Sequence, residues 1–451
     1  SIVVEWQHET LMKFVVLILL IIGSVLCKKK TNRSIVVEWH APFFSGGGYC
    51  SEATTLAIAL AKVPGISLFL RQHGDSYSQN YVAGLDDNTA KELAKLTSKK
   101  RIKPIDVVIC HSEPGAWHVL QGPSWPSSPC PPRGENNAKI QIGRTMFETD
   151  RIPDGWPQRL LAMDEIWVPT NFQATVFKDH GVDNVFILGE AVDINLFSPA
   201  SNQKNMYEDH FKQASFLVLS VFKWEARKGW DILLRAWRAA FSTQECQANE
   251  SKPTLILLTN AFHSSNDFER KLDDFSRDSN IGLNETELGL KALCPIRIMS
   301  QLSQDELVAL YRRADILVMP TRGEGWGRPH VEAMSVGKPI IATNWSGPTA
   351  YLTSDNGYPL RIQPDLVLVG GDGPFRNHRW AEPDIQHLTQ LLLRARDFPD
   401  ERQKKGIRAR QDMMTLFSPE ILARKVRDRI YKYAHSVSPS SSSSVKNDLR
   451  R

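Results

Sequence analysis

Short apolar runs of strand length alternate with longer amphipathic runs along most of this chain, and this alternation constrains the fold more than any other feature. Strand-like runs lie at residues 35–39, 66–70, 106–110, 139–143, 165–168, 216–220, 254–258, 296–298, 316–319 and 339–343. Helical patterns lie between several of them, at 51–62, 230–241, 305–313 and 329–335, and a last one lies at 420–434. Because such alternation implies parallel strands with helices packed on both faces of a sheet, the sequence predicts an α/β fold.

The alternating series pauses near residues 190–213, so we expect two doubly wound halves. A chain of 451 residues, 42% of them hydrophobic, is too long for one core and suits two domains of ordinary size. The predicted domains cover residues 34–205 and 206–400, and a C-terminal helical segment covers 401–435. Residues 436–451 include a run of serines that cannot build a core, and we expect this tail to be disordered.

An apolar segment near the N-terminus predicts a targeting or anchoring role. Residues 14–27 are almost uninterrupted apolar sequence, and lysines flank them at Lys13 and at 28–30. A full membrane span needs about 20 apolar residues, so the region 1–33 reads as a signal peptide or a membrane anchor, with membrane association through residues 12–27. Asn-x-Ser/Thr triplets occur at Asn32, Asn249, Asn284 and Asn344. We expect a location in the endomembrane system or secretory pathway, and the flanking lysines leave the cytosolic face open.

Charge and cysteine content narrow the function classes. The net charge of +5 is a small basic excess that fits a phosphate site and gives no reason to expect a nucleic-acid partner. The six cysteines show no Cys-x-x-Cys pair and no zinc-like spacing. The sequence therefore predicts neither a disulfide framework nor a zinc site.

A glycine-rich loop follows the strand-like run at 316–319 and precedes a helical run. Gly323, Gly325 and Gly327 would let backbone N–H groups approach a ligand at the N-terminus of that helix, which is a ready anion site. Glu324 lies in the loop, and Glu332 follows on the helix. Carboxylates accept hydrogen bonds from sugar and ribose hydroxyls but repel phosphate, so amides and cations must hold any diphosphate.

A basic cluster upstream offers those cations. Lys223 follows the strand at 216–220, and Arg227 and Lys228 open the next helical region. Cations and a helix N-terminus at the same edge of the second sheet are what a diphosphate requires. We therefore predict that Lys223, Arg227 and Lys228 bind a diphosphate.

Residues 319–343, from Met319-Pro320-Thr321 through Gly323-Glu324-Gly325-Trp326-Gly327-Arg328-Pro329-His330-Val331-Glu332 to Thr343, resemble the nucleotide-sugar signature of the family 4 (group 1) retaining glycosyltransferases. The resemblance implies a GT-B fold, in which two Rossmann-like domains face a cleft. It further implies that Glu324 and the amides after it face the donor sugar and that Glu332 holds the ribose. The donor-binding set implied here is Gly325, Trp326, Gly327, Arg328 and Glu332, with Trp326 in place of the commoner Phe.

Further stretches extend the resemblance over most of residues 34–434. Residues 165–170 are similar to the last strand of the acceptor domain, and residues 192–199 to the interdomain linker. The resemblance implies that the C-terminal helix at 401–435 returns to the first domain. It also implies a nucleotide-sugar donor, UDP- or GDP-linked, and a glycan, lipid or protein acceptor whose identity the sequence leaves open.

The first half offers weaker candidates. Gly46, Gly47 and Gly48 resemble the acceptor-side glycine turn and equally resemble an ordinary loop. His111 ends a predicted strand, where a side chain can reach a ligand, although a packed or solvated histidine fits as well. Glu148 occupies the place where similar enzymes carry a sugar-contacting histidine, so the histidine's role does not transfer to it. With Glu324, these two side chains are the catalytic candidates.

The sequence contains no Asp-x-Asp pair, the carboxylate motif that holds a metal on the donor diphosphate of single-domain glycosyltransferases. We therefore expect no metal and no other cofactor. The predicted activity is metal-independent transfer of a hexosyl group to a hydroxyl acceptor, with retention. The alternatives are a GT-B nucleotide-sugar epimerase or phosphorylase, although no pyridoxal site is found, and a catalytically silent nucleotide-sugar-binding protein.

Overall fold

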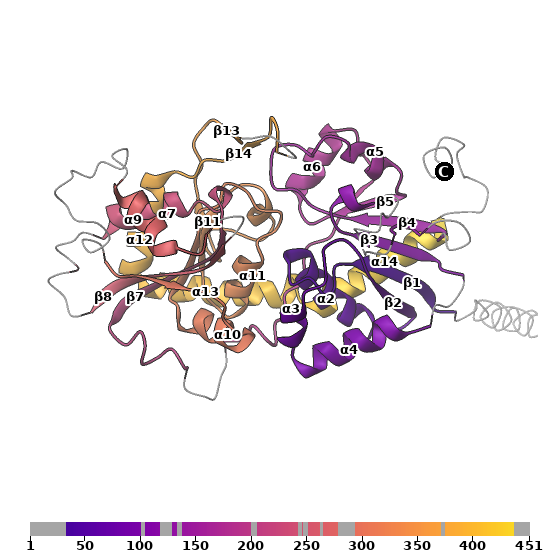
Figure 1. Cartoon of the computed structure of the whole chain (residues 1–451), viewed down its shortest axis with the longest axis horizontal. Coiled ribbons are helices and arrows are strands. Elements are labelled where there is room, and N and C mark those ends of the chain that lie inside the picture. The colour runs from indigo at the N-terminus through magenta and orange to yellow at the C-terminus, as the bar shows by residue number, and fades with distance from the viewer. Residues whose placement is uncertain are drawn as a thin grey trace, which may run out of the picture.

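The computed structural model describes residues 33–100, 104–117, 129–132, 138–199, 205–241, 246, 251–261, 265–277, 294–370 and 375–436. Two halves lie side by side along the longest axis, and each is built on a six-stranded parallel sheet (Figure 1). The predicted α/β fold with two doubly wound halves is confirmed.

The first sheet has the strand order β2-β1-β3-β4-β5-β6. Its strands are β1 (Ile35–Ala41), β2 (Ile66–Gln72), β3 (Val107–His111), β4 (Ile140–Arg144), β5 (Glu165–Val168) and β6 (Val185–Ile187). Its helices are α2 (Gly48–Leu60), α3 (Gln79–Ala83), α4 (Asp87–Ser98), α5 (Trp156–Leu161) and α6 (Asn171–Asp179). Alternate residues of β3 enter separate cores, with Val107 and Ile109 in one and Val108 and Cys110 in the other. Both faces of this sheet are therefore buried, as parallel sheets require.

The second sheet has the order β12-β11-β10-β7-β8-β9. Its strands are β7 (Ala214–Trp224), β8 (Lys252–Ala261), β9 (Ile296–Met299), β10 (Ile316–Met319), β11 (Ile340–Thr343) and β12 (Tyr358–Leu360). Its helices are α7 (Trp230–Ala240), α9 (Phe268–Arg277), α10 (Gln304–Arg313), α11 (Arg328–Ser335), α12 (Ile385–Asp397) and α13 (Pro399–Leu416). Two short antiparallel strands, β13 (Val367–Leu368) and β14 (Arg379–Trp380), form a separate hairpin.

The C-terminal segment is two helices, with a break after α13. The second, α14 (Pro419–Ser436), lies along the first half, where Leu422 and Val426 share a core with α2 and β1 (Figure 1). Its polar face binds the same half, since Arg429 pairs with Glu165 and the Tyr431 hydroxyl donates to the Gly65 carbonyl at 3.1 Å. The last described helix thus lies on the half that contains the first described strand, β1.

Both chain ends carried predictions that lie largely outside the described residues. The apolar segment 12–27, read as a signal peptide or membrane anchor, is one, and the serine-rich tail after residue 436 is the other. Within the part of the chain that the structure describes, no helix is both long and apolar enough to cross a bilayer.

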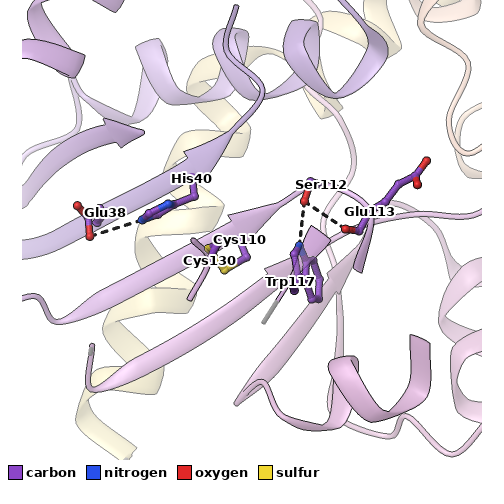
Figure 2. Close-up of a disulfide and its surroundings, with 7 residues drawn as sticks. All are labelled: Glu38, His40, Cys110, Ser112, Glu113, Trp117 and Cys130. Atoms are coloured by element: carbon purple, nitrogen blue, oxygen red, sulfur yellow. Dashed lines mark hydrogen bonds and ion pairs between the residues drawn. A yellow bond between two sulfur atoms is a disulfide. The ribbon is translucent and has the colours of Figure 1, made fainter. Parts of the chain in front are cut away.

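Two disulfides contradict the prediction that the cysteines form no such framework. Cys110 at the end of β3 is bonded to Cys130, with the Cα atoms 5.7 Å apart, and Cys246 is bonded to Cys294, with the Cα atoms 5.3 Å apart. Figure 2 shows the first of these beside Ser112, whose hydroxyl accepts a hydrogen bond from the Trp117 indole at 2.9 Å. The partners are 20 and 48 residues apart in sequence, so no local pattern announces pairs that only the folded sheets bring together.

Candidate functional site

The loop between β10 and α11 has a backbone that only glycine permits at one position. Gly327 precedes α11 with φ +104°, and a Cβ there would lie 2.4 Å from the His330 Nδ1 and 2.8 Å from the Tyr351 hydroxyl. Pro329 stands in the first turn of the helix, where its fixed φ is preorganised. The sequence thus builds a close backbone turn at a helix N-terminus, the geometry that favours an anion.

Glu324 is the centre of a buried charge cluster in this loop. It is 6% exposed, and its carboxylate accepts hydrogen bonds from the Lys228 ammonium at 2.7 and 3.0 Å and from Arg227 at 3.3 Å. Burial alone would raise the pKa of Glu324, but Lys228 and Arg227 outweigh it and lower the pKa to about 2. Glu324 is therefore an ionised acceptor at neutral pH.

The two cations come from the turn before α7. Residues Ala226–Lys228 form a 3-10 turn that ends at Gly229, with φ +64°, and a Cβ on Gly229 would lie 1.9 Å from the Pro320 carbonyl oxygen. This close approach brings the turn against the segment that leads to Glu324. Burial first, and then the charge of Arg227, lowers the pKa of Lys228. The predicted convergence of Arg227 and Lys228 on the Glu324 loop is thus present in the structure.

Lys223 differs from the other two predicted cations. It lies exposed near the end of β7, five positions before Lys228, whereas Arg227 and Lys228 are largely buried against Glu324. Its assignment to the donor diphosphate stays a prediction.

Glu332 is buried on α11 and has its own polar neighbours, which differ from those of Glu324. The Tyr311 hydroxyl donates to it at 3.0 Å, and Arg328 lies 3.8 Å away, one helical turn earlier. Burial raises the pKa of Glu332. Arg328 also lies 3.8 Å from Glu190, and it donates to the Ala191 carbonyl, so it joins α11 to the segment between the halves.

Gly325 and Trp326 are the two remaining predicted residues of the loop. Gly325 has no side chain, and the side chain of Trp326 is buried. The Gly325 carbonyl accepts a hydrogen bond from the Gln173 amide at 2.6 Å, and a Cβ on Gly325 would lie 2.6 Å from the sulfur of Met146. The Trp326 ring is buried, with Tyr351 and Phe417 at centroid distances of 5.0 and 5.3 Å. An indole in place of a phenyl ring therefore enlarges a hydrophobic contact and leaves the loop backbone available.

Glu148 lies on the first half, directly opposite this loop. Its carboxylate is 3.1 Å from the Arg227 Nε, and its carbonyl oxygen would lie 2.2 Å from a Cβ on Gly323. Burial would lower the pKa of Arg227, but Glu148 and Glu324 outweigh it and raise the pKa. One guanidinium therefore serves carboxylates from both halves, Glu148 from the first and Glu324 and Glu225 from the second.

His111 has different surroundings. It is fully buried, its Nε2 is 3.0 Å from the Glu52 carboxylate, and Glu52 also accepts a 2.7 Å hydrogen bond from Arg144. Burial would raise the pKa of Glu52, but Arg144 and His111 outweigh it and lower the pKa. Of the two readings that the sequence left open for His111, the structure shows a packed histidine within an ion network.

The glycine triplet leads into α2. Gly46 has φ +78° and packs against Tyr81, with a Cβ contact distance of 3.0 Å, and Gly47 caps the helix. The triplet therefore forms a real helix entry. Its role toward an acceptor stays a prediction.

Sequence reasoning missed three buried polar residues near the site, namely Glu52, Glu190 and His330. Both ring nitrogens of His330 lack a hydrogen-bond partner among the described residues, and burial lowers its pKa to about 4. Burial first, and then the charge of Glu52, raises the pKa of Glu190. Only the position of His330, inside the quoted motif, gave a signal that could have identified it.

Residues 289–359, which include the Glu324 loop and α11, match the family model of glycosyl transferases group 1. The chain is also similar to D-inositol 3-phosphate glycosyltransferase of Corynebacterium aurimucosum, with 24% identity over 40% of this chain and 40% of that protein. A second relative is MMP alpha-(1->4)-mannosyltransferase of Mycolicibacterium hassiacum, with 31% identity over 30% of this chain and 28% of that protein. The matched region thus spans well under half the length of these relatives.

Solved structures resemble the fold over a larger share of the chain. Anabaena HepE, crystallised with UDP and glucose, has a TM-score of 0.58 at 13% identity, and the match covers 88% of this chain and all of that one (100%). Sucrose-phosphate synthase from Thermosynechococcus elongatus has a TM-score of 0.57 at 14% identity, over 90% of this chain and 100% of that one. At these identities the likeness concerns the fold, and the two-sheet GT-B architecture is shared.

Proposed function

We propose that this chain, which belongs to the group 1 glycosyltransferases through the match over residues 289–359, transfers a hexosyl group from a UDP- or GDP-linked sugar to a hydroxyl acceptor. The observation that carries the proposal is the ionised, buried Glu324 bound to Lys228 and Arg227 beside the N-terminus of α11. A carboxylate that accepts hydrogen bonds from sugar hydroxyls would thus lie in direct contact with two cations that bind a diphosphate.

Different residues would bind different parts of the donor. The backbone of Gly325, Trp326 and Gly327 would face the donor with its N–H groups, and Arg328 would add a guanidinium at the start of α11. Glu332 would accept hydrogen bonds from the ribose diol. The buried cations stabilise the leaving nucleoside diphosphate without solvent reorganisation, which is where electrostatic catalysis gains most.

In this reaction the bond from the anomeric carbon to the diphosphate oxygen breaks, and a bond to the acceptor oxygen forms. The electron pair of the broken bond leaves with the diphosphate, and the acceptor hydroxyl passes its proton to the Glu148 carboxylate. Glu148, held opposite Glu324 by their shared Arg227, is the acceptor-side carboxylate. Retention at the anomeric carbon and independence of a metal belong to this proposal, since Arg227 and Lys228 supply the charge that a metal would otherwise carry.

The disulfides support the proposed location. Disulfides persist mainly in oxidising compartments, so the Cys110–Cys130 and Cys246–Cys294 bonds favour the lumen of the endomembrane system or the secretory pathway.

Turnover of the full chain with UDP-, GDP- and ADP-sugars in the presence of EDTA tests the function. We expect release of one nucleoside diphosphate with transfer of the sugar, and a loss of at least about a hundredfold in Glu324→Gln. Glu208→Gln, an exposed glutamate, is the matched control. Strict dependence on a divalent ion would contradict the metal-free mechanism, and donor binding without any transfer would favour a silent binding protein.

A further inference from the structure

Residues 375–382, which include β14, connect the two halves next to the proposed site. The Asp150 carboxylate accepts a hydrogen bond from the Arg379 amide at 2.7 Å, and the Asp150 amide donates to the Arg379 carbonyl at 3.1 Å. Phe147 stacks on Phe375 at a centroid distance of 5.3 Å. We call residues 375–382 the clasp, and Figure 1 shows its hairpin reaching from the second half toward the first.

The shortest polar contact of the clasp is between two buried side chains. His378 Nδ1 lies 2.6 Å from the Thr149 hydroxyl, which also donates to the Arg151 carbonyl at 3.0 Å. A hydroxyl has one hydrogen, so Thr149 must accept from the imidazole if it donates to Arg151. With the Thr149 hydrogen on the Arg151 carbonyl, His378 carries its proton on Nδ1. Burial lowers the pKa of His378 and keeps the ring neutral at physiological pH.

The other end of the clasp is fixed to the donor loop. The Ala381 amide donates to the Arg322 carbonyl at 3.0 Å, and Glu382 accepts two hydrogen bonds from the Arg322 guanidinium, at 2.7 and 3.0 Å. Arg322 in turn donates to the Ala226 carbonyl at 2.6 Å and pairs with Asp231. The clasp thus contacts the segment beside Glu148 and the arginine two residues before Glu324.

We infer that His378 is a positioning residue of the proposed transfer: through Thr149 it holds Glu148 in register with Arg227 and the Glu324 loop. The inference rests on the proposed function and deepens it. It says that the clasp, a segment of the second half outside residues 289–359, keeps the Glu148 carboxylate in place. His378 contacts Thr149, which is adjacent to Glu148 in the chain, and it acts only through that neighbour.

Three variants separate positioning from bulk packing. His378→Phe keeps an aromatic ring against Phe147 but loses the N–H donor, whereas His378→Asn keeps a donor near the Nδ1 position. His210→Ala, an exposed histidine whose Nδ1 lies 3.1 Å from the Met206 carbonyl in the turns before β7, is the control. We expect His378→Phe to lower kcat about tenfold with the donor KM within about twofold, since a misplaced group costs rate rather than donor binding. His378→Asn should recover most of that loss.

A double variant and an exchange measurement complete the test. Adding His378→Phe to Thr149→Val should cause little further loss of kcat beyond that of Thr149→Val alone, because Thr149→Val already removes the His378 hydrogen bond as well as the one to Arg151. Hydrogen exchange at residues 147–151 should rise in His378→Phe whether or not turnover is detected. Additive losses, an asparagine variant no better than phenylalanine, or unchanged exchange would overturn the role of His378. A wild-type chain without turnover but with the exchange response would instead refute the proposed function.

Discussion

The two halves place their buried charges in contrasting ways. In the second half Glu324 meets Lys228 and Arg227 at a glycine-rich loop, and Arg227 reaches across to Glu148. In the first half Glu52 meets Arg144 and His111, and all three are enclosed within that half between α2, β3 and β4. Both clusters are buried carboxylates held by basic side chains, but only the Glu324 cluster includes a carboxylate from the other half.

The difference shows that a buried charge cluster acquires a functional meaning from what surrounds it. Around Glu324 the loop is rich in glycine, and the charged groups come from both halves of the molecule. Around Glu52 the neighbours include the rings of Trp39 and Tyr49, both of which pack on His111. We therefore expect changes in the Glu52 cluster to affect stability and changes in the Glu324 cluster to affect the reaction.

The largest expected effect is on stability in the first half. Glu52→Ala would leave the Arg144 guanidinium buried without its partner, and breaking such a pair typically costs about 3–5 kcal/mol. Urea unfolding measures this loss. Glu92→Ala, which removes a partly exposed pair with Lys95, should change the free energy of unfolding by no more than about 0.5 kcal/mol. Comparable losses in the two variants would contradict the structural role of the Glu52 cluster.

The second effect concerns Glu148, which joins the halves. Glu148→Gln removes the charge beside Arg227, and we expect the rate of transfer to fall about a hundredfold, the range of a positioned acid or base. Nucleotide affinity should change little, because Glu324 still holds Lys228. Asp154→Asn, an exposed acid in the same segment, is the control for initial-rate measurements. A large loss of nucleotide affinity in Glu148→Gln would place this residue on the donor side.

The third and smallest effect is a pH dependence of stability. His330 has a pKa of about 4 in the folded chain against 6.5 as its ordinary value, so the unfolded chain binds the proton more readily between these limits. Its contribution is complete above the unfolded pKa and is lost as pH falls toward the folded pKa, about 2 kcal/mol between roughly pH 7 and pH 5. In His330→Phe the denaturant midpoint of unfolding should change less with pH over this range than it does in the wild type. An unchanged pH slope would mean that His330 has the same pKa in the folded and the unfolded chain.

The sequence predicted the strands well, because buried parallel strands read as continuous apolar runs that few other structures imitate. The pause near residues 190–213 likewise falls between β6, which ends at Ile187, and β7, which begins at Ala214. The start of α14 at Pro419 lies one residue before the helical pattern predicted at 420–434, whereas α13 was not predicted as a separate helix. Disulfide partners were unpredictable, because their meeting depends on the sheets rather than on local spacing.

The site shows the same limit at the level of single residues. Glu324, Arg227 and Lys228 stand in local motifs of strand, turn and helix, so their meeting was predictable. Glu52 looks like an unremarkable glutamate in an apolar helix, and His378 follows a segment without periodicity. Their partners are 92 and 229 residues away in sequence, and contacts at that separation carry no local pattern.

Titration of the full chain with UDP and GDP in EDTA, by calorimetry, tests the central claim that the Glu324 loop and its two cations form a nucleotide-sugar site. We predict saturable binding of one of these nucleotides to the wild type, weakened about thirtyfold or more in Lys228→Ala through the loss of a charged contact. Lys91→Ala, an exposed lysine on α4, should bind as the wild type does. Absence of nucleotide binding, or equal affinity in Lys228→Ala and the wild type, would contradict the account.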